Sequence, residues 1–175
     1  MQATVIKAQP KPAVKKMDVR SINPFIIAAV SIVKETTGLS VAKDNVFVQQ
    51  GKFVPAGTGI SLDISGDISG KIVYEFSKGV AARISQMMVK KNIDMQTSAV
   101  DFKQMLNSAI LELGNQIAGK AITLFENQAI NCHISPPKFF LGTDLQLIHK
   151  HLKTIVLILK TEFGNFSINL ALYSG

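Results

Sequence analysis

The feature that most restricts how this chain can fold is a long helical pattern from about Ala99 to Asn127. Apolar residues recur there at steps of three and four, which places them on one stripe of a helix. The stripe consists of Leu106, Ile110, Leu113, Ile117, Ala121 and Leu124. We expect this stripe to face a core.

Strand patterns occur in pairs before and after this helix. Residues 60–65 alternate apolar and polar side chains, and a second strand-like run follows at 68–76. Near the end of the chain, residues 154–161 and 166–172 flank the turn at 162–165. Each pair predicts a β-hairpin.

Two further helices are predicted between the strands. Asn23 is expected to cap a helix that has Pro24 at its first position and ends at Gly38. Ser77 is expected to cap a helix over residues 78–91, followed by a break in the pattern at 94–97. Its predicted inward side chains are Val80, Ile84, Met87 and Met88.

This order of elements predicts an α+β fold, an antiparallel β-sheet with long helices packed on it. The sequence lacks the Gly-rich phosphate loop, GxGxxG and GxSxG patterns of nucleotide-binding and hydrolase folds. Its 175 residues, 47% of them hydrophobic, suffice for one domain with a real core. We expect that domain to span residues 18–175.

Residues 1–17 are predicted to form a flexible basic leader. The first 20 residues hold five basic side chains and one acidic one, which is +4 of the net charge of +7. Pro10 and Pro12 interrupt any periodic pattern there. A solvated leader is the common meaning of such a stretch, so we assign it no nucleic acid and no membrane partner.

The sequence also predicts a cytoplasmic protein. A single cysteine, Cys132, cannot form an internal disulfide, and the N-terminus has no apolar secretory segment. The longest apolar stretch, residues 24–33, is about half of the roughly 20 residues that a membrane span requires. No membrane span is expected.

Glu112 and Asn115 are the candidate site residues. On a helix that turns about 100° per residue they lie roughly 60° apart, nearly opposite the centre of the apolar stripe. Ser108 and Gly119 lie on the same outward side and are small enough for another molecule to approach closely. The spacing alone is weak evidence, because polar residues on a solvated helix face show it equally well.

The chain contains a second ExxN spacing that serves as an internal comparison. Glu162 and Asn165 repeat it in the predicted hairpin turn, where turn chemistry alone explains a Gly-Asn pair. The sequence around Glu112 and Asn115, and not their spacing, must therefore distinguish a functional pair from a chance one.

That context resembles the CheC/CheX phosphatase family. Residues 106–120, LNSAILELGNQIAGK, resemble the signature helix of the family. Residues 66–74, GDISGKIVY, resemble the strand pair before that helix, and residues 134–137, ISPP, resemble the short segment after it. The resemblance spans about residues 18–174 and implies a CheC/CheX-like fold.

The resemblance implies an enzyme that hydrolyses the aspartyl phosphate of a CheY-like chemotaxis response regulator. Asn115 would orient the attacking water, and Glu112 would contact the active-site lysine of the partner. An acyl phosphate is already activated, so its hydrolysis requires positioning of water more than a strong base. A glutamine orients water in the same manner in small GTPases.

The resemblance also implies one site and no cofactor of the chain's own. Relatives with two ExxN motifs carry the other on the first helix, but here Glu35 is followed three positions later by Gly38. Mg²⁺ is expected on the response regulator. The other function that remains open is a non-catalytic module that binds a response regulator or a flagellar switch component.

Three other expectations concern different residues. The residues Cys132, His133, His149 and His151 are a weak candidate metal site. The residues Met87, Met88, Met95 and Met105 are expected to fill the core rather than form a binding surface. A homodimer through sheet edges is expected, because relatives of the CheX type pair in this way and strand 154–159 is apolar at successive positions, as in strands covered on both faces.

Overall fold

The computed structural model describes residues 19–51, 55–89, 98–142 and 153–174. In chain order the elements are α1 (Val19–Thr37), β1 (Ala42–Gln50), β2 (Thr58–Gly66), β3 (Ile68–Phe76), α2 (Lys78–Val89), α3 (Ala99–Glu126), β4 (Cys132–Ile134), β5 (Lys138–Leu141), β6 (Lys153–Thr161) and β7 (Gly164–Ser174). The predicted α+β fold is confirmed.

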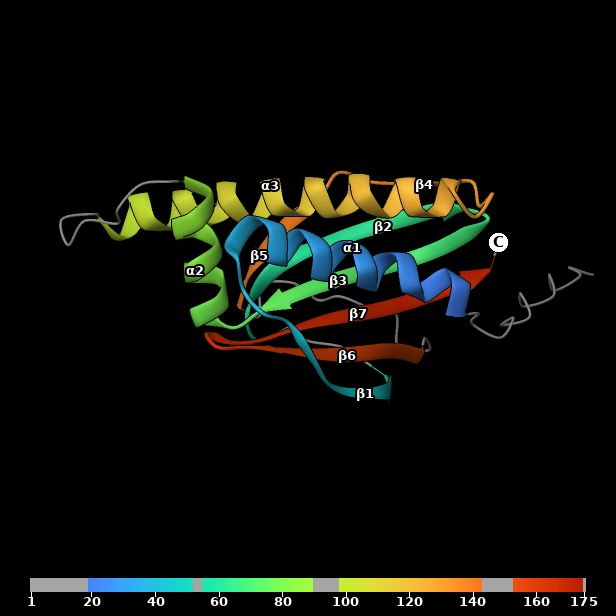
Figure 1. The fold of residues 1–175 in the computed structure, drawn as a ribbon, viewed down its shortest axis with the longest axis horizontal. Coiled ribbons are helices and arrows are strands. Elements are labelled where there is room, and N and C mark those ends of the chain that lie inside the picture. Colours follow the sequence, from blue (N-terminus) through green and yellow to red (C-terminus); the bar gives the residue numbers. More distant parts are fainter. Residues whose placement is uncertain (1–18, 52–54, 90–97, 143–152, 175) are drawn as a thin grey trace, which may run out of the picture.

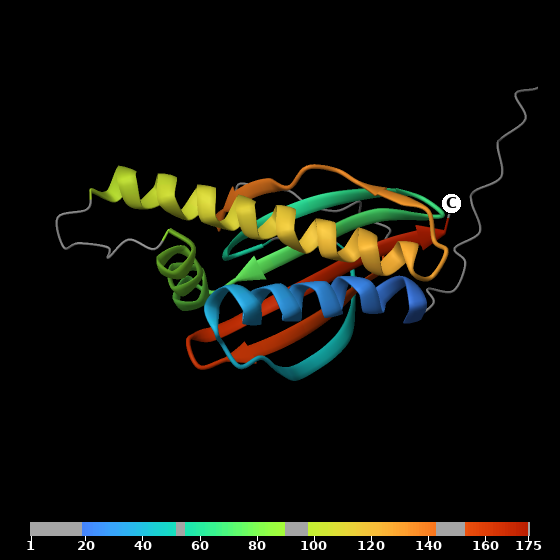
Figure 2. The same ribbon diagram turned by 45° about the horizontal axis from the view of Figure 1, so that its top comes forward.

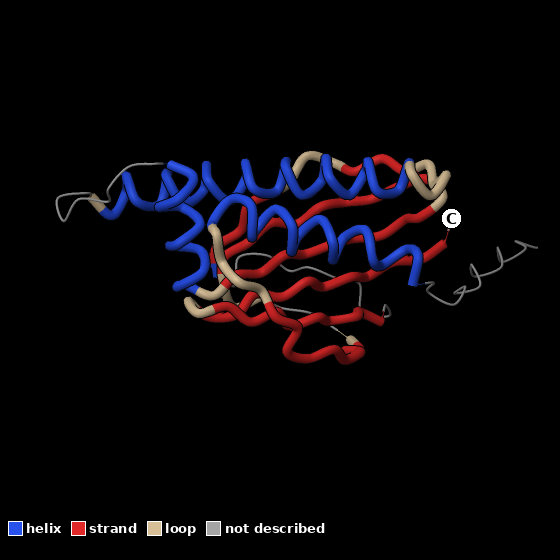
Figure 3. The backbone as a smooth tube through the Cα atoms, in the orientation of Figure 1, coloured by secondary structure: helices blue, strands red, loops and turns tan. Residues whose placement is uncertain are grey.

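The strands form one antiparallel sheet in the order β1-β6-β7-β3-β2-β4, and β5 also pairs with β2. Helices α1 and α3 lie side by side across one face of this sheet and run in opposite directions, while α2 lies at one end (Figure 1, Figure 2). Figure 3 shows the same two layers, with helices over strands. The core fills the space between them.

Both predicted hairpins are confirmed. Strands β2 and β3 pair from Thr58 opposite Phe76 to Ile64 opposite Gly70. Strands β6 and β7 pair up to Thr161 opposite Gly164, where a tight turn joins them. Strand β3 also pairs with β7, so the two hairpins form the middle of the sheet.

The predicted long helix is α3, and its apolar stripe faces the core. Ile110, Leu113 and Ile117 are fully buried between the sheet and α1. The helix begins after Ser98, whose hydroxyl accepts a hydrogen bond from the backbone N–H of Asp101. This side chain satisfies one of the N–H groups that have no partner in the first turn.

The predicted start of the first helix is wrong. Helix α1 already includes Val19, the first residue that the structure describes, so Asn23 is not its cap and Pro24 lies inside it. A proline removes one hydrogen bond of the helix ladder. Burial of Phe25 and its neighbours against the sheet and α3 compensates, since packing contributes more to helix stability than local propensity. The predicted end at Gly38 is confirmed, with φ of 69° and its N–H bonded to the Lys34 carbonyl.

Helix α2 begins directly after Ser77 as predicted, but one predicted inward residue is wrong. Val80 and Ile84 are fully buried and Met88 packs partly against the core, whereas Met87 is 38% exposed. The reason is that α2 covers the end of the sheet and not its face, so its last turn has core neighbours on fewer sides (Figure 1). Residues 90–97, with the predicted break and Met95, lie outside the described residues.

The sequence patterns did not predict strand β1. It pairs with β6 along the edge of the sheet, yet eight of its nine residues are exposed. A strand exposed on both faces needs no alternation of apolar and polar residues. Strand β6 is largely buried on both faces as expected, and β1 and β7 pair with its two edges.

Within the described residues, no helix combines the length and hydropathy needed to cross a membrane.

Candidate functional site

Glu112 and Asn115 lie in the middle of α3 and are both exposed, as predicted. Leu113, between them in sequence, is fully buried, so the two polar side chains project from the face opposite the core. Among the described elements, none lies over the outer surface of α3 (Figure 1). A second protein can therefore reach both side chains at once.

The backbone between these two residues is held tightly. Gly114 is buried and lies directly against Ile60 of β2 and Pro137, which precedes β5. This close approach requires a residue without a side chain. It fixes the height of α3 above the sheet at the position of the site.

The neighbouring small residues leave the outer face open. Ser108 and Gly119 are exposed, and a Cβ at Gly119 would have no atom within 4 Å. The expected set of two polar residues flanked by small ones is therefore present on the surface of α3.

Gln116 makes a contact that the sequence analysis did not identify. Its side-chain Nε2 donates a hydrogen bond to Glu112 Oε1 over 3.0 Å. Both residues are exposed and lie one turn apart on α3. The sequence feature that could have predicted this contact is the spacing of four residues, at which side chains on a helix are neighbours.

The second ExxN spacing lies at the β6–β7 hairpin, but the turn is shorter than predicted, because Gly164 and Asn165 already pair with β6 as the first residues of β7. Glu162 follows the end of β6, and Asn165 lies at the start of β7 with its backbone carbonyl accepting from the Ser77 N–H. Thr161 Oγ1 donates to the Gly164 carbonyl across the same turn. Backbone and turn hydrogen bonds account for these residues.

The first helix lacks a second copy of the motif. Glu35 is exposed near the end of α1, but Gly38 lies beyond the helix in a left-handed conformation. No carboxamide occupies the position that Asn115 has on α3.

Cys132 and His133 are adjacent in β4, while His149 and His151 lie outside the described residues. The described part of the chain contains no group of three His, Cys, Asp or Glu side chains that could hold a metal ion. Burial raises the pKa of the Cys132 thiol, and the carboxylates of Asp67 and Glu126 raise it further. A protonated thiol is a poor nucleophile, which disfavours a nucleophilic role for Cys132.

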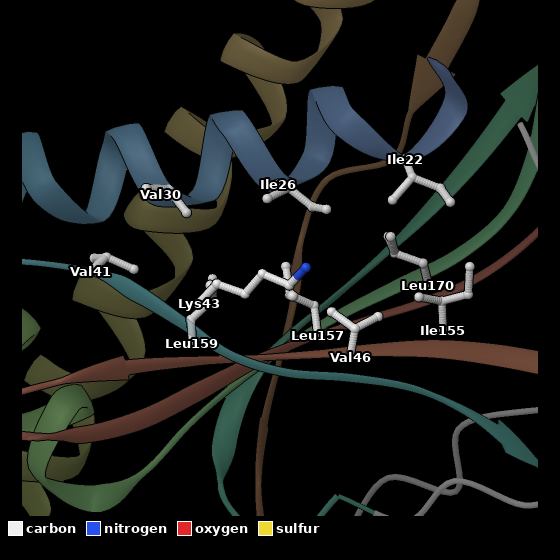
Figure 4. Close-up of a pocket in the computed structure, with 10 residues that line it drawn as sticks. All are labelled: Ile22, Ile26, Val30, Val41, Lys43, Val46, Ile155, Leu157, Leu159 and Leu170. Atoms are coloured by element: carbon white, nitrogen blue, oxygen red, sulfur yellow. The ribbon is translucent and has the colours of Figure 1, made fainter. Parts of the chain in front are cut away.

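An apolar groove of about 510 Å³ lies between α1 and strands β1 and β6 (Figure 4). Its lining residues are Ile22, Ile26, Val30, Val41, Lys43, Val46, Ile155, Leu157, Leu159 and Leu170. None of these residues comes from α3, and Lys43 is the one charged member. The groove therefore offers no acid–base pair for hydrolysis.

Comparisons with known proteins agree on one family. The family model described as chemotaxis phosphatase CheX matches residues 59–160. The CheY-P phosphatase CheX of Thermotoga maritima is 27% identical over 151 residues, covering 86% of this chain and 91% of that protein.

Solved structures share the fold. The chemotaxis protein CheX from Desulfovibrio desulfuricans matches with a TM-score of 0.70 at 18% identity, over 87% of this chain and 97% of that one. A chain from the CheX–CheY–BeF3–Mg²⁺ complex of Borrelia burgdorferi matches with a TM-score of 0.66 at 19% identity, over 87% and 97%.

Proposed function

Because the chain belongs to the CheX family of chemotaxis phosphatases, whose model matches more than half of it, we propose that it hydrolyses the aspartyl phosphate of a CheY-like response regulator. The observation that carries this proposal is the position of Glu112 and Asn115. Both are exposed on one face of α3, whose backbone Gly114 holds against the sheet.

We assign Asn115 the role of orienting the attacking water. Its carboxamide offers both a hydrogen-bond acceptor and two donors, so it can hold a water molecule in one orientation. The acyl phosphate is already activated, and correct placement of the water supplies much of the remaining rate enhancement. A neutral amide is sufficient for this step.

We assign Glu112 the role of a docking contact with the active-site lysine of the regulator. A carboxylate paired with an ammonium group forms a charge-assisted hydrogen bond, which fixes orientation as well as adding affinity. Since Glu112 and Asn115 are less than one turn apart, the register that Glu112 sets also determines where Asn115 lies.

We propose that Mg²⁺ is bound by the regulator. The B. burgdorferi relative was solved as a complex of CheX with CheY, BeF3 and Mg²⁺, which supports this assignment. A metal ion beside the phosphoryl group would stabilise the charge that develops there. The proposed site on this chain then orients the water and the partner and supplies no metal ligand. We propose that the reaction takes place in the cytoplasm, where the regulator acts.

We propose further that the protein is a homodimer joined through the edge of β1. This strand exposes three successive apolar residues, since Val46, Phe47 and Val48 are 45%, 43% and 57% accessible. An exposed apolar edge strand is a ready surface for pairing with another chain. The expected dimer through sheet edges is most simply made there.

A turnover assay tests the main proposal against the alternative of a non-catalytic binding module. Candidate regulators are phosphorylated with a small phosphodonor, and decay of the phosphoryl group is followed with and without this protein. The phosphatase proposal requires faster decay at a protein concentration below that of the regulator. Binding without faster decay would support the non-catalytic module.

A further inference from the structure

We infer that Gln116 is a positioning residue for Glu112, holding its carboxylate for the lysine of the regulator. This inference rests on the proposed function of Glu112. Its basis is the hydrogen bond from Gln116 Nε2 to Glu112 Oε1, 3.0 Å long, on the exposed face of α3.

The two neighbours of Glu112 lie on opposite sides of it. At about 100° per residue, Gln116 is displaced roughly 40° from Glu112 around the helix, and Asn115 is displaced roughly 60° in the other direction. Gln116 therefore holds the carboxylate from the side that faces away from Asn115. The space between Glu112 and Asn115 stays free for the partner.

The chemistry of the contact leaves Glu112 able to bind. An ionised carboxylate has two oxygens and about four acceptor positions. Gln116 occupies one of them on Oε1, so Oε2 remains available to a lysine ammonium group. A Glu side chain that is already ordered loses less conformational entropy when the partner docks.

Gln116 has no other side-chain partner among the described residues, and it is exposed. Replacing it should therefore leave the core of the protein intact. This allows its effect on Glu112 to be measured separately from folding.

The first test compares Gln116→Leu and Gln116→Glu with the wild type in steady-state dephosphorylation. We expect Gln116→Leu to raise KM for the phosphorylated regulator about fivefold, the size of one ordinary net hydrogen bond, with a smaller change in kcat. Gln116→Glu should raise KM further, because like charges four residues apart on a helix repel. Gln104→Leu, a matched change at another exposed position of α3, should leave both constants unchanged.

The second test is a double-mutant cycle with Glu112→Ala. If Gln116 acts through Glu112, Gln116→Leu should have no further effect on KM once the carboxylate has been removed. An additive effect in the double variant, or an unchanged KM in the single variant, overturns the positioning role.

A third measurement separates this inference from the proposed function. Side-chain NMR relaxation of Glu112 in the free protein should report greater mobility in Gln116→Leu than in the wild type or in Gln104→Leu. Equal mobility in all three proteins overturns the positioning role, whatever the activity. Failure of the wild type to dephosphorylate any regulator would instead overturn the proposed function, leaving the mobility result to decide the role of Gln116.

Discussion

Gly114 on α3 approaches Ile60 on β2 so closely that a Cβ at Gly114 would lie 2.5 Å from Ile60 Cδ1. The same Cβ would lie 2.9 Å from the Cβ of Pro137, whose ring cannot rotate away. Gly119, five residues later on the same helix, has no atom within 4 Å of its Cβ position. The candidate site thus contains one glycine that packing requires, and a second glycine that packing does not require follows it on the same helix.

This contrast predicts opposite effects for two matched substitutions. Gly114→Ala should lower the free energy of unfolding by about 1 kcal/mol, because overpacking of about 1–3 kcal/mol exceeds the helix-propensity gain of about 1 kcal/mol. Gly119→Ala should raise it by about 0.5–1 kcal/mol, since only the propensity gain applies. Urea denaturation measures both. Equal stabilisation by the two variants would show that α3 is not packed tightly at Gly114.

The exposed edge of β1 predicts the assembly state. Light scattering at micromolar concentration should give a mass of about twice the 19.0 kDa of one chain. Val48→Lys should shift the mass toward that of a monomer, because charged residues on an edge strand prevent pairing. Ile27→Lys, on α1 and similarly exposed at 48%, is the matched control and should remain dimeric. A wild-type mass near 19 kDa alone would remove the dimer.

The leader is predicted to be dispensable. A chain beginning at Met17 should match the full chain in melting temperature and in dephosphorylation, because residues 1–16 lack apolar periodicity and carry much of the excess charge. Loss of activity in the shortened chain, with an unchanged melting temperature, would identify the leader as a docking element.

The sequence predicted the parts of this fold that have one buried face. The alternation in β2 and the long stripe of α3 both arise because one side of each element meets the core. Strand β1 was not predicted, because its segment is exposed on both faces and includes the polar residues Lys43, Asp44 and Asn45, so it shows no alternation of apolar and polar side chains. The start of α1 was wrong because tertiary packing overrides a local proline signal.

The geometry of the candidate site was predictable in part for a related reason. The outward direction of Glu112 and Asn115 follows from helix periodicity, which the sequence carries. The contact between Gln116 and Glu112 depends on the rotamers of two exposed side chains, which the sequence pattern does not specify. The close approach of Gly114 to Ile60 depends on how α3 lies on the sheet, so it required the tertiary structure.

An ion pair on β2 and β3 predicts one contribution to the pH dependence of stability. The Asp63 carboxylate accepts a hydrogen bond from Lys71 Nζ, and Lys138 Nζ lies 3.6 Å from its other oxygen. The hydrogen bond from Lys71 lowers the pKa of Asp63 below its ordinary value, against the opposing effect of burial. A lowered folded-state pKa stabilises the protein above the unfolded-state value of about 3.9, and this stabilisation is lost as the pH falls through the folded-state value.

Asp63→Asn should therefore lower the free energy of unfolding at neutral pH. The loss should be less than about 1 kcal/mol, because the Asp63 side chain is 45% exposed and solvent screens the pair. The difference from wild type should shrink as the pH falls below the unfolded-state value of about 3.9 and through the lowered folded-state pKa of Asp63. Asp44→Asn, on exposed β1, is the control. A difference that stays constant down to acidic pH would contradict the assignment to this ion pair.

The assigned roles of Asn115 and Glu112 predict different kinetic defects in folded proteins. Asn115→Ala should bind the phosphorylated regulator as the wild type does and lose about 100-fold or more in kcat, because an interaction made in the transition state is removed without loss of ground-state affinity. Glu112→Ala should raise KM and also lower kcat, since it loses both the contact with lysine and the register that places Asn115. Both residues are exposed, so circular dichroism and melting temperature should stay near wild type.

Asn165→Ala supplies the control for a carboxamide in the same spacing but at the start of β7, directly after the hairpin turn. It should keep full activity, with at most a loss of stability from the turn. Calorimetry measures the affinity of each variant for the phosphorylated regulator, and single-turnover decay of the phosphoryl group measures its rate of dephosphorylation. Full dephosphorylation by Asn115→Ala would show that this carboxamide does not orient the water, and the mechanism proposed for α3 would then be wrong.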